Sequence, residues 1–506
     1  MAEQSEQPMW KQLFRLSPES GVSLQRQLRK ALVDAILNHR IALDRPLPSS
    51  RELAKQLGIA RNTVVLSYQH LVDNGYLHSR ARSGYFVNPE ILEGRLETRQ
   101  AEGGTTPTDW TGRLKQHPSL QRNIRKPLDW KTYKYPFIYG QPDPELFPMN
   151  DWRECCRELQ SVAEVTSFAQ DRFDADDPLL VEQIQNRVLP RRGVWADSDE
   201  ILITLGAQHA LFLLGALLLD GDSMVGIEDP GYPDARNIFT LSGARVQPLP
   251  VDQDGVVPGR QLDQCDVAYV TPSHHVPTTV TLPRERRLEL LERAGRSDFV
   301  LIEDDYESET NFVGEPTPAL KSLDQEDRVI YVGGLSKTLA PGLRLGFMVG
   351  PKALIREARA LRRLMVRHPP SNNQRIVALF LSMGYHDSHI HRLNKVLKER
   401  WQLMNDALAR HLPDSFNVPT FGGTSYWIKG KPPLDATALA EDAREHSLLL
   451  EPGEVYFMED NGPRNFFRLG YSSIRTERIE PGIAKLATLM REQRDTRRKA
   501  YAGLTD

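Results

Sequence analysis

The strongest constraint on the fold is a series of short β-rich runs that alternate with longer amphipathic helical stretches from about residue 130 onward. The runs are ILIT (201–204), MVGIED (224–229), VAYVT (267–271), FVLIEDD (299–305), VIYVGG (329–334) and LGFMVG (345–350). Apolar strands separated by helices are typical of a mostly parallel sheet with helices on both faces. The sequence therefore predicts an α/β domain, with a mainly helical part after about 355 and a smaller α+β segment around 416–490.

The length of 506 residues is too great for one ordinary domain, so two or three domains are expected. The N-terminal residues lack the apolar segment of a secretory signal. The longest apolar stretch, 211–219, is far shorter than the ~20 residues of a membrane span. Three cysteines, two of them adjacent, give neither a disulfide framework nor a zinc site. We expect a cytoplasmic protein without a membrane segment.

Residues 21–89 are predicted to form a separate module of short helices followed by a hairpin. Apolar side chains recur every four residues over 24–36, a serine at 49 or 50 can cap a second helix, and a glycine ends that helix. A third helix starts near Arg61 and exposes the polar side chains of its first turn, and 75–87 reads as strand, turn and strand. This arrangement matches a helix-turn-helix, with a three-helix protein-interaction module as the alternative.

The charge distribution favours nucleic acid as the partner of this module. Residues 11–90 hold 12 Lys and Arg against 6 Asp and Glu, so this window carries +6 and the remainder −9 of the net charge of −3. Concentrated positive charge is what binding to a phosphate backbone requires, and Arg80 and Arg82 near the hairpin tip can reach phosphates beside a groove. A solvated basic face would show the same charge.

A second functional signal lies where the predicted strands of the α/β domain end. Lys337 comes just after the run 329–334, at the carboxyl edge of the sheet, where open α/β sheets bind ligands. Ser336 precedes it and Arg344 follows seven residues later, so a hydroxyl and a guanidinium can converge on one phosphate. A lysine after a strand is usually an ordinary surface residue, so this motif alone does not predict a binding site.

The ends of neighbouring strands supply further residues that could bind the same ligand. Asp304 can keep a pyridine nitrogen protonated, and Tyr306 can hydrogen-bond the phenolic oxygen of the same ring. The free amides of Ala207 and Gln208 at a helix N-terminus form an anion site, and Tyr232 can stack on the ring. Four such pieces, each at the end of a β-run, predict a pyridoxal 5′-phosphate site with a Schiff-base lysine.

Two strings resemble known families. LPSSRELAKQLGIARNTVVLSYQHLVDNGYLHSRARSGYFV resembles the winged helix of GntR-type regulators, and 130–490 resembles fold-type I aminotransferases, so the whole chain resembles the MocR/GabR subfamily of GntR-type transcription regulators. The resemblance implies that Arg468, in FFRLGYSS, clamps the carboxylate of an effector. Internal pairing within its strand is the alternative for Arg468. The resemblance also implies that the DNA-facing residues are Ser49, Ser50, Arg51, Arg61, Asn62 and Thr63, with Arg82 and Gly84 in the wing.

The expected organisation is multidomain, with an N-terminal all-α, winged-helix part and a C-terminal α/β part of the pyridoxal-phosphate-dependent aminotransferase fold type I. The expected segments are an N-terminal arm (1–20), a GntR-type winged helix-turn-helix DNA-binding domain (21–89), a linker (90–130), an aminotransferase-like domain (131–490) and a C-terminal tail (491–506).

The resemblance implies a regulator that binds double-stranded operator DNA with two half-sites as a homodimer, domain-swapped head to tail. A small amine or amino acid is expected to form an external aldimine in place of Lys337 and so to alter operator binding. Two alternatives stay open. One is an active aminotransferase with an accessory N-terminal domain, and the other is a DNA-binding protein whose large domain has lost the cofactor.

Two departures from the aminotransferase pattern bear on turnover. Val276 and Thr279 stand where many aminotransferases have Asn and Gly, and the missing Asn usually hydrogen-bonds the cofactor's phenolic oxygen. We therefore expect at most weak transaminase activity. His386, His389 and His391 point to different faces of a predicted helix without a carboxylate cluster nearby, so no metal site is expected.

Overall fold

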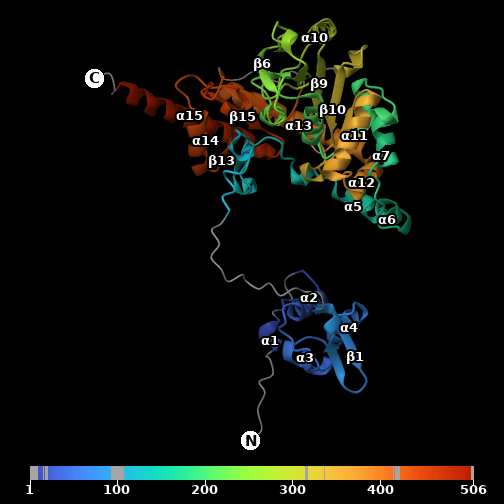
Figure 1. Cartoon of the computed structure of the whole chain (residues 1–506). Coiled ribbons are helices and arrows are strands. Elements are labelled where there is room, and N and C mark those ends of the chain that lie inside the picture. Colours follow the sequence, from blue (N-terminus) through green and yellow to red (C-terminus); the bar gives the residue numbers. More distant parts are fainter. Residues whose placement is uncertain are drawn as a thin grey trace. The chain divides into compact units, whose positions relative to one another are not determined.

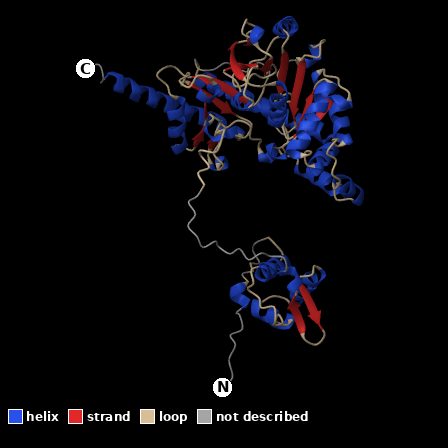
Figure 2. Ribbon diagram, viewed as in Figure 1, coloured by secondary structure: helices blue, strands red, loops and turns tan. Residues whose placement is uncertain are grey.

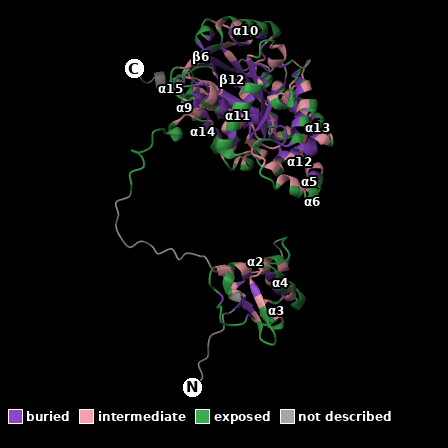
Figure 3. Cartoon of the chain, turned by 45° about the vertical axis from the view of Figure 1, so that its right-hand side comes forward, coloured by how far each residue is buried: buried purple, intermediate pink, exposed green. Residues whose placement is uncertain are grey.

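The computed structural model describes residues 10–14, 16–17, 21–92, 108–313, 317–335, 337–413, 415 and 422–502. The chain divides into two compact units, Met1–Trp110 and Thr111–Asp506 (Figure 1). In each unit the buried residues gather in the interior and the exposed ones on the outside (Figure 3). Among the described helices, none combines the length and the apolar character needed to cross a membrane.

Unit 1 is a helical module closed by a two-stranded antiparallel hairpin (Figure 2). Ser49 caps the second of the three predicted helices by accepting the amide of Glu52 at 3.2 Å, and Gly58 ends this helix with a φ of 69°. Leu28, Leu32 and Ile36 of the apolar repeat over 24–36 face the core, as predicted, whereas Leu24 at its start is half-buried. The elements are α1 (Trp10–Leu13), α2 (Leu24–Leu37), α3 (Ser50–Leu57), α4 (Arg61–Asp73), β1 (Leu77–Arg80) and β2 (Gly84–Val87).

Part of the segment expected to be an N-terminal arm is built into this core. Trp10 and Phe14 are 6% and 3% exposed, and their ring centroids lie 5.4 Å apart against the apolar faces of the other helices. The first residues are mostly polar, so the sequence did not predict that these two aromatic side chains belong to the core.

The main sheet of unit 2 contains every predicted β-run as a strand. Its order is β4-β11-β10-β9-β8-β5-β6-β7, and β10, β9, β8, β5 and β6 are parallel. β11 runs antiparallel to both β10 and β4, so the sheet is mixed at this edge. The strands are β4 (Ile201–Thr204), β5 (Met224–Asp229), β6 (Arg245–Asp252), β7 (Gly255–Val256), β8 (Val267–Val270), β9 (Val300–Asp305), β10 (Val329–Gly334) and β11 (Gly346–Val349).

Helices cover both faces of this sheet, which explains why its strands are apolar on both sides. Leu202 and Met348 point into the core beneath α8, α9 and α11, whereas Ile201 and Val349 point into the opposite core beneath α7 and α12. The helices of this region are α5 (Met149–Glu158), α6 (Val162–Phe168), α7 (Pro178–Gln183), α8 (Ala207–Leu218), α9 (Pro233–Leu241), α10 (Arg284–Ser297), α11 (Lys352–Val366) and α12 (Ser371–Ser382).

The C-terminal part of unit 2 packs helices against a small antiparallel sheet of order β12-β15-β14. In this sheet Arg468 lies opposite Trp427 on one side and Glu451 on the other. A short parallel pair joins β13 to β3. The elements are α13 (Tyr385–His411), α14 (Ala436–Glu445), α15 (Ile479–Ala502), β3 (Tyr135–Pro136), β12 (Ser425–Lys429), β13 (Leu448–Leu449), β14 (Glu451–Pro452) and β15 (Phe466–Gly470).

Two expected boundaries differ from the structure. Residues 111–130, expected to be part of a linker, group with unit 2. The segment expected as a C-terminal tail from 491 onward continues α15 to Ala502. In both places polar, charged sequence concealed a segment that packs against, or extends, the larger unit.

Candidate functional site

One cavity of unit 2 gathers most of the residues that the sequence singled out. It has a volume of about 360 Å³ and lies at the carboxyl ends of β4, β9 and β10. The predicted residues that line it are Ala207, Gln208, Tyr232, Asp304, Tyr306, Lys337, Arg344 and Arg468. Ser336, also predicted, lies outside the described residues. The lining residues that the sequence analysis did not single out for the cofactor include Ile124, Lys126, Tyr139 and Asp234.

The amine of Lys337 is buried among aromatic rings. Its Nζ donates a hydrogen bond to the Tyr139 hydroxyl and lies 3.9 Å from the centroid of the Tyr306 ring. Burial lowers the pKa of Lys337 to about 7, and the nearby Arg468 also lowers it. A larger part of the amine than in an ordinary lysine is therefore neutral at neutral pH, and the neutral amine is the form that attacks a carbonyl carbon.

Two neighbouring aspartates on β9 have different surroundings because successive side chains of a strand point to opposite faces. Asp305 is occupied internally, since it accepts hydrogen bonds from Arg192 Nε at 2.7 Å and from the Tyr331 hydroxyl at 2.9 Å. Asp304 lines the cavity and, among the described residues, accepts only from the Tyr269 hydroxyl, at 2.8 Å. Burial raises the pKa of Asp304 to about 6. This geometry favours Asp304 over Asp305 as the carboxylate available to a ligand.

Two buried oxygen atoms at the cavity have no hydrogen-bond partner among the described residues. They are Oδ1 of Asp304 and the hydroxyl of Tyr306. Buried polar atoms without partners are rare in native proteins and call for one. The nitrogen and the phenolic oxygen of a pyridoxal ring are partners of the required kind, so these atoms fit the cofactor that the sequence predicts.

An anion cradle also borders the cavity. Arg344 packs its guanidinium over Gly206, where an added Cβ would lie 3.5 Å from Cζ, and it donates to the Leu205 carbonyl at 3.2 Å. The same guanidinium faces the N-terminus of α8, whose first amides have no partners within the helix. Gly346 is required here, because a Cβ on it would lie 2.8 Å from the backbone of Gly206. A phosphate fits this cradle.

Tyr232 and Gln208 share one acidic partner. The Tyr232 hydroxyl donates to Oδ2 of Asp234 at 3.0 Å, and the Gln208 amide also donates to this oxygen. Gln208 in turn accepts from Arg344 at 3.4 Å. The side chain of Gln208 is thus tied to the cradle, and the aromatic ring of Tyr232 remains part of the cavity wall.

Arg468 reaches the cavity from β15 of the small sheet. It is 1% exposed, and it donates to the Ser425 hydroxyl at 2.9 Å and to the Tyr456 hydroxyl at 3.4 Å. Its Nη2 is buried without a hydrogen-bond partner among the described residues, and no ion pair is found for it there. The internal pairing that the sequence left open therefore uses only part of this guanidinium, and the free nitrogen can receive an acid group.

Tyr139 is the main contact that the sequence analysis missed. Its ring lies beside two cations of the cavity, 4.5 Å from Lys337 Nζ and 3.3 Å from Arg468 Cζ. Burial raises the pKa of Tyr139 well above its usual value. No local pattern marks this residue, because it reaches the site when the start of unit 2 folds back against strands that come much later in the chain.

The two departures from the aminotransferase pattern lie in a loop beside the cavity. Val276 lines the cavity with an apolar side chain. Thr279 adopts a φ of 63°, a left-handed conformation that favours glycine. An amide donor is therefore missing at position 276, and the backbone at position 279 keeps a glycine-like shape with a threonine in it.

The predicted DNA-facing residues of unit 1 lie around the start of α3, the start of α4 and the hairpin turn. Arg61 donates to the Ser50 hydroxyl at 3.4 Å, which joins the first turns of the two helices. The Ser49 hydroxyl is engaged in the cap of α3. Thr63 and Ser50 are half-buried, whereas the exposed residues are Ser49, Arg51, Arg61, Asn62, Arg82 and Gly84.

The histidines considered as metal ligands lie on α13. His386 is buried 3.3 Å from Glu309, and His389 is hydrogen-bonded to the Thr338 carbonyl at 2.7 Å. Within the described ranges, no group of three or more His, Cys, Asp and Glu side chains is arranged to hold a metal ion. His389 instead joins α13 to Thr338, next to Lys337, and His386 joins α13 to Glu309.

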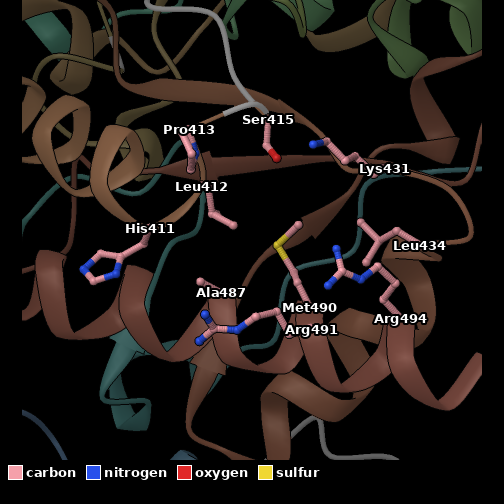
Figure 4. A pocket seen from close by; sticks show the side chains of 10 residues that line it. All are labelled: His411, Leu412, Pro413, Ser415, Lys431, Leu434, Ala487, Met490, Arg491 and Arg494. Atoms are coloured by element: carbon pink, nitrogen blue, oxygen red, sulfur yellow. The ribbon is translucent and has the colours of Figure 1, made fainter.

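A second hollow lies in the C-terminal part of unit 2, between the end of α13 and α15 (Figure 4). It has a volume of about 200 Å³, and its rim is basic, with His411, Lys431, Arg491 and Arg494. None of the residues predicted for the cofactor lines it. It is a surface feature distinct from the cavity at Lys337.

Two family profiles match the chain. The profile of aminotransferases of class I and II matches residues 174–486, and that of bacterial regulatory proteins of the gntR family matches residues 24–87. The HTH-type transcriptional regulator TauR of Rhodobacter capsulatus is 42% identical over 480 residues, which cover 94% of this chain and 99% of that protein. A probable rhizopine catabolism regulatory protein of Rhizobium meliloti, MocR, is 29% identical, covering 93% of this chain and 94% of that protein.

Solved structures match unit 2. The kynurenine aminotransferase of Pyrococcus horikoshii, solved in complex with PMP, superposes with a TM-score of 0.68 at 27% identity, covering 76% of this chain and 98% of that one. The fold of unit 2 is thus that of a fold-type I aminotransferase.

The lowered pKa of Lys337 generates a prediction on pH. From pH 6 to pH 8 the neutral fraction of an amine with a pKa near 7 rises about tenfold and then levels off. The rate at which added pyridoxal phosphate attaches to Lys337, measured by borohydride trapping and peptide mapping, should follow this curve. A rate that continues to rise tenfold per pH unit above pH 8 would show that the amine has an ordinary pKa.

Proposed function

The chain belongs to the MocR/GabR subfamily of GntR-type transcription regulators, and from this premise we propose that it senses an amino compound and adjusts its affinity for DNA accordingly. Its cofactor is pyridoxal 5′-phosphate. The observation that carries the proposal is the buried Lys337 amine in a chain that also has a GntR helix-turn-helix. This amine shares one cavity with three polar atoms, Asp304 Oδ1, the Tyr306 hydroxyl and Arg468 Nη2, for which the described residues offer no hydrogen-bond partner.

The proposed roles follow from the chemistry of each side chain. Lys337 holds the cofactor, Asp304 keeps its ring nitrogen protonated, and Tyr306 donates to its phenolic oxygen. Tyr232 stacks on the ring. When bound, the cofactor supplies an aldehyde carbon that condenses with a primary amine, either that of Lys337 or that of the effector. Its phosphate is assigned to Ala207, Gln208, Ser336 and Arg344.

The response to an effector is proposed to begin at Lys337. The acid group of the effector binds Nη2 of Arg468, which needs a partner. Once an amine competes for the same carbon, the ammonium of Lys337 can remain hydrogen-bonded to the Tyr139 hydroxyl, which it already contacts. The loss of the covalent tether then changes the relative stability of two conformations of unit 2, and only this difference can alter DNA affinity.

We propose that the DNA-bound form is a homodimer, domain-swapped head to tail, with two winged helices on two operator half-sites and a cytoplasmic location. An isologous dimer on a palindromic site matches the symmetry of the duplex. Base edges are assigned to Arg61, Asn62 and Thr63, and phosphates to Ser49, Ser50, Arg51 and the wing residues Arg82 and Gly84.

An active aminotransferase is the competing function, and one observation disfavours it. Val276 offers no amide donor where many aminotransferases have Asn, and Tyr306 is left as the remaining donor to the phenolic oxygen. Rapid multiple turnover with an amino acid and a 2-oxo acid, followed by absorbance, would favour the enzyme. A stable spectral shift without turnover would favour the sensor.

The effector response gives a direct prediction. With a duplex selected from random DNA as probe, a panel of amines and amino acids should contain members that change the affinity of the wild type by about 5- to 150-fold. Lys337→Ala should bind the same duplex and lose the response, because no amine can then replace a tether. Lys352→Ala, an exposed lysine paired with Asp197, is the matched control and should respond as the wild type does. An effector response that survives in Lys337→Ala would contradict the proposal.

The assigned DNA contacts give another prediction. Arg61→Ala should weaken binding to the selected duplex by about 1–3 kcal/mol, because a base contact is removed. The difference in affinity between the selected duplex and random DNA should therefore become smaller. Lys30→Ala, exposed on α2, should change affinity far less. Fluorescence anisotropy at fixed salt measures both variants, and equal losses for the two would show that Arg61 contributes charge alone.

A further inference from the structure

Besides Lys337, Arg344 and Arg468, the cavity contains a further cation, Lys126, to which the aminotransferase-like constellation gives no role. Lys126 lines this cavity together with Arg468, and its Nζ lies 5.3 Å from the centroid of the Tyr139 ring, the ring that Arg468 also contacts. Its ammonium packs so closely on Gly140 that an added Cβ there would lie 3.1 Å from Nζ. Lys126 is thus positioned on the side of the cavity where Arg468 enters.

Lys126 is half-buried in the wall of the cavity. Among the described residues, no hydrogen bond or ion pair is found for its ammonium. Burial lowers the pKa of Lys126, and the nearby Arg468 also lowers it, whereas Glu451 raises it. Glu451 and Asp234 lie near enough to affect Lys126, but among the described residues neither Lys126 nor Arg468 forms an ion pair. A buried charge without such a partner is unfavourable, so an acid group is a ligand that both cations can bind.

The cradle for the phosphate does not account for Lys126. That cradle consists of Arg344 and the N-terminus of α8. The charged groups that most affect the pKa of Lys126 are instead Glu451 and Arg468, which face each other across β14 and β15. Lys126 therefore lies on the side of the cavity that Arg468 lines, which we call the effector side.

Lys126 also belongs to the part of the chain that follows the connection from unit 1. We call residues 111–130 the leading segment. Arg122 fixes it to the loop at 454–460 by donating to the carbonyl oxygens of Phe457 at 2.9 Å and Met458 at 2.7 Å. Asn237 of α9 donates to the Arg122 carbonyl at 3.0 Å.

The same loop reaches the effector side of the cavity. Tyr456, one residue before Phe457, accepts a hydrogen bond from Arg468 at 3.4 Å. Ile124 of the leading segment packs against the apolar cluster that contains Tyr456 and Val276. The leading segment therefore contacts the cavity through Lys126 directly and through the 454–460 loop indirectly.

We propose that Lys126 binds the acid group of the effector together with Arg468, so that the site selects amines bearing an acid group and the bound acid fixes the leading segment. This inference rests on the proposed sensing function and deepens it, since it names the ligand class and the segment that registers occupancy. The acid group joins two parts of unit 2, β15 through Arg468 and the leading segment through Lys126. An amine without an acid group engages neither.

The test compares ω-amino acids of two to five carbons with n-alkylamines of equal length, using protein loaded with pyridoxal phosphate. Absorbance titration gives the affinity of each probe for the wild type, Lys126→Met and Arg125→Met. Arg125 is exposed and adjacent, so it serves as the matched control. Lys126→Met should bind the preferred ω-amino acid on the order of tenfold more weakly, with alkylamine affinity unchanged, because one charge-assisted hydrogen bond is lost. Arg125→Met should keep the wild-type ratio.

Amide hydrogen exchange supplies a second measurement. An acid group bound by Arg468 alone would not change the exchange rate of the leading segment. The ω-amino acid should slow exchange over 118–126 in the wild type and leave it unchanged in Lys126→Met. An unaltered acid-to-alkylamine ratio in Lys126→Met would overturn the inference, and so would weaker binding of pyridoxal phosphate itself in that variant. A wild type that responds to no amine would overturn the proposed function as well, and this failure is visible without any variant.

Discussion

The site depends on one constraint, which is that the amine of Lys337 is buried without a carboxylate in ion-pair contact among the described residues. A buried ammonium is costly, so burial favours the neutral amine and lowers its pKa to about 7. Tyr139 and Tyr306 enclose the amine, and the Tyr139 hydroxyl accepts its hydrogen bond. The chain thereby keeps a nucleophilic amine ready at neutral pH, and the other functional groups are arranged around it.

The sheet explains how distant parts of the sequence meet at this amine. Parallel strands end at the same edge, so β9 delivers Asp304 and β10 leads to Lys337 at one place. β11 returns antiparallel from the turn that holds Arg344, which brings this guanidinium over the start of α8. The small C-terminal sheet adds Arg468. The leading segment adds Lys126, and the chain just after this segment adds Tyr139. Groups for a ring, a phosphate and an acid therefore line one cavity.

The sequence predicts the parts of this arrangement that depend on local pattern. Apolar runs with their flanking turns locate every strand of the main sheet except the two short or less apolar ones, β6 and β7, and strand ends identify Asp304 and Lys337. The antiparallel direction of β11 escapes prediction, because a strand covered on both faces has the same apolar pattern in either direction. Tyr139 and Lys126 escape as well, because their roles arise only from long-range folding. Trp10 escapes for another reason, which is that the sequence around it is polar and gives no apolar pattern.

In the proposed function, an amine changes DNA affinity by replacing the bond between Lys337 and the cofactor. Borohydride reduction makes this bond permanent, and peptide mapping can verify that the pyridoxyl group resides on Lys337. The most direct measurement is the affinity of the reduced protein for its selected duplex, with and without an amine to which the unreduced protein responds. We expect the reduced protein to bind DNA with an affinity that no longer depends on the amine. An unchanged amine response after complete reduction at Lys337 would contradict it.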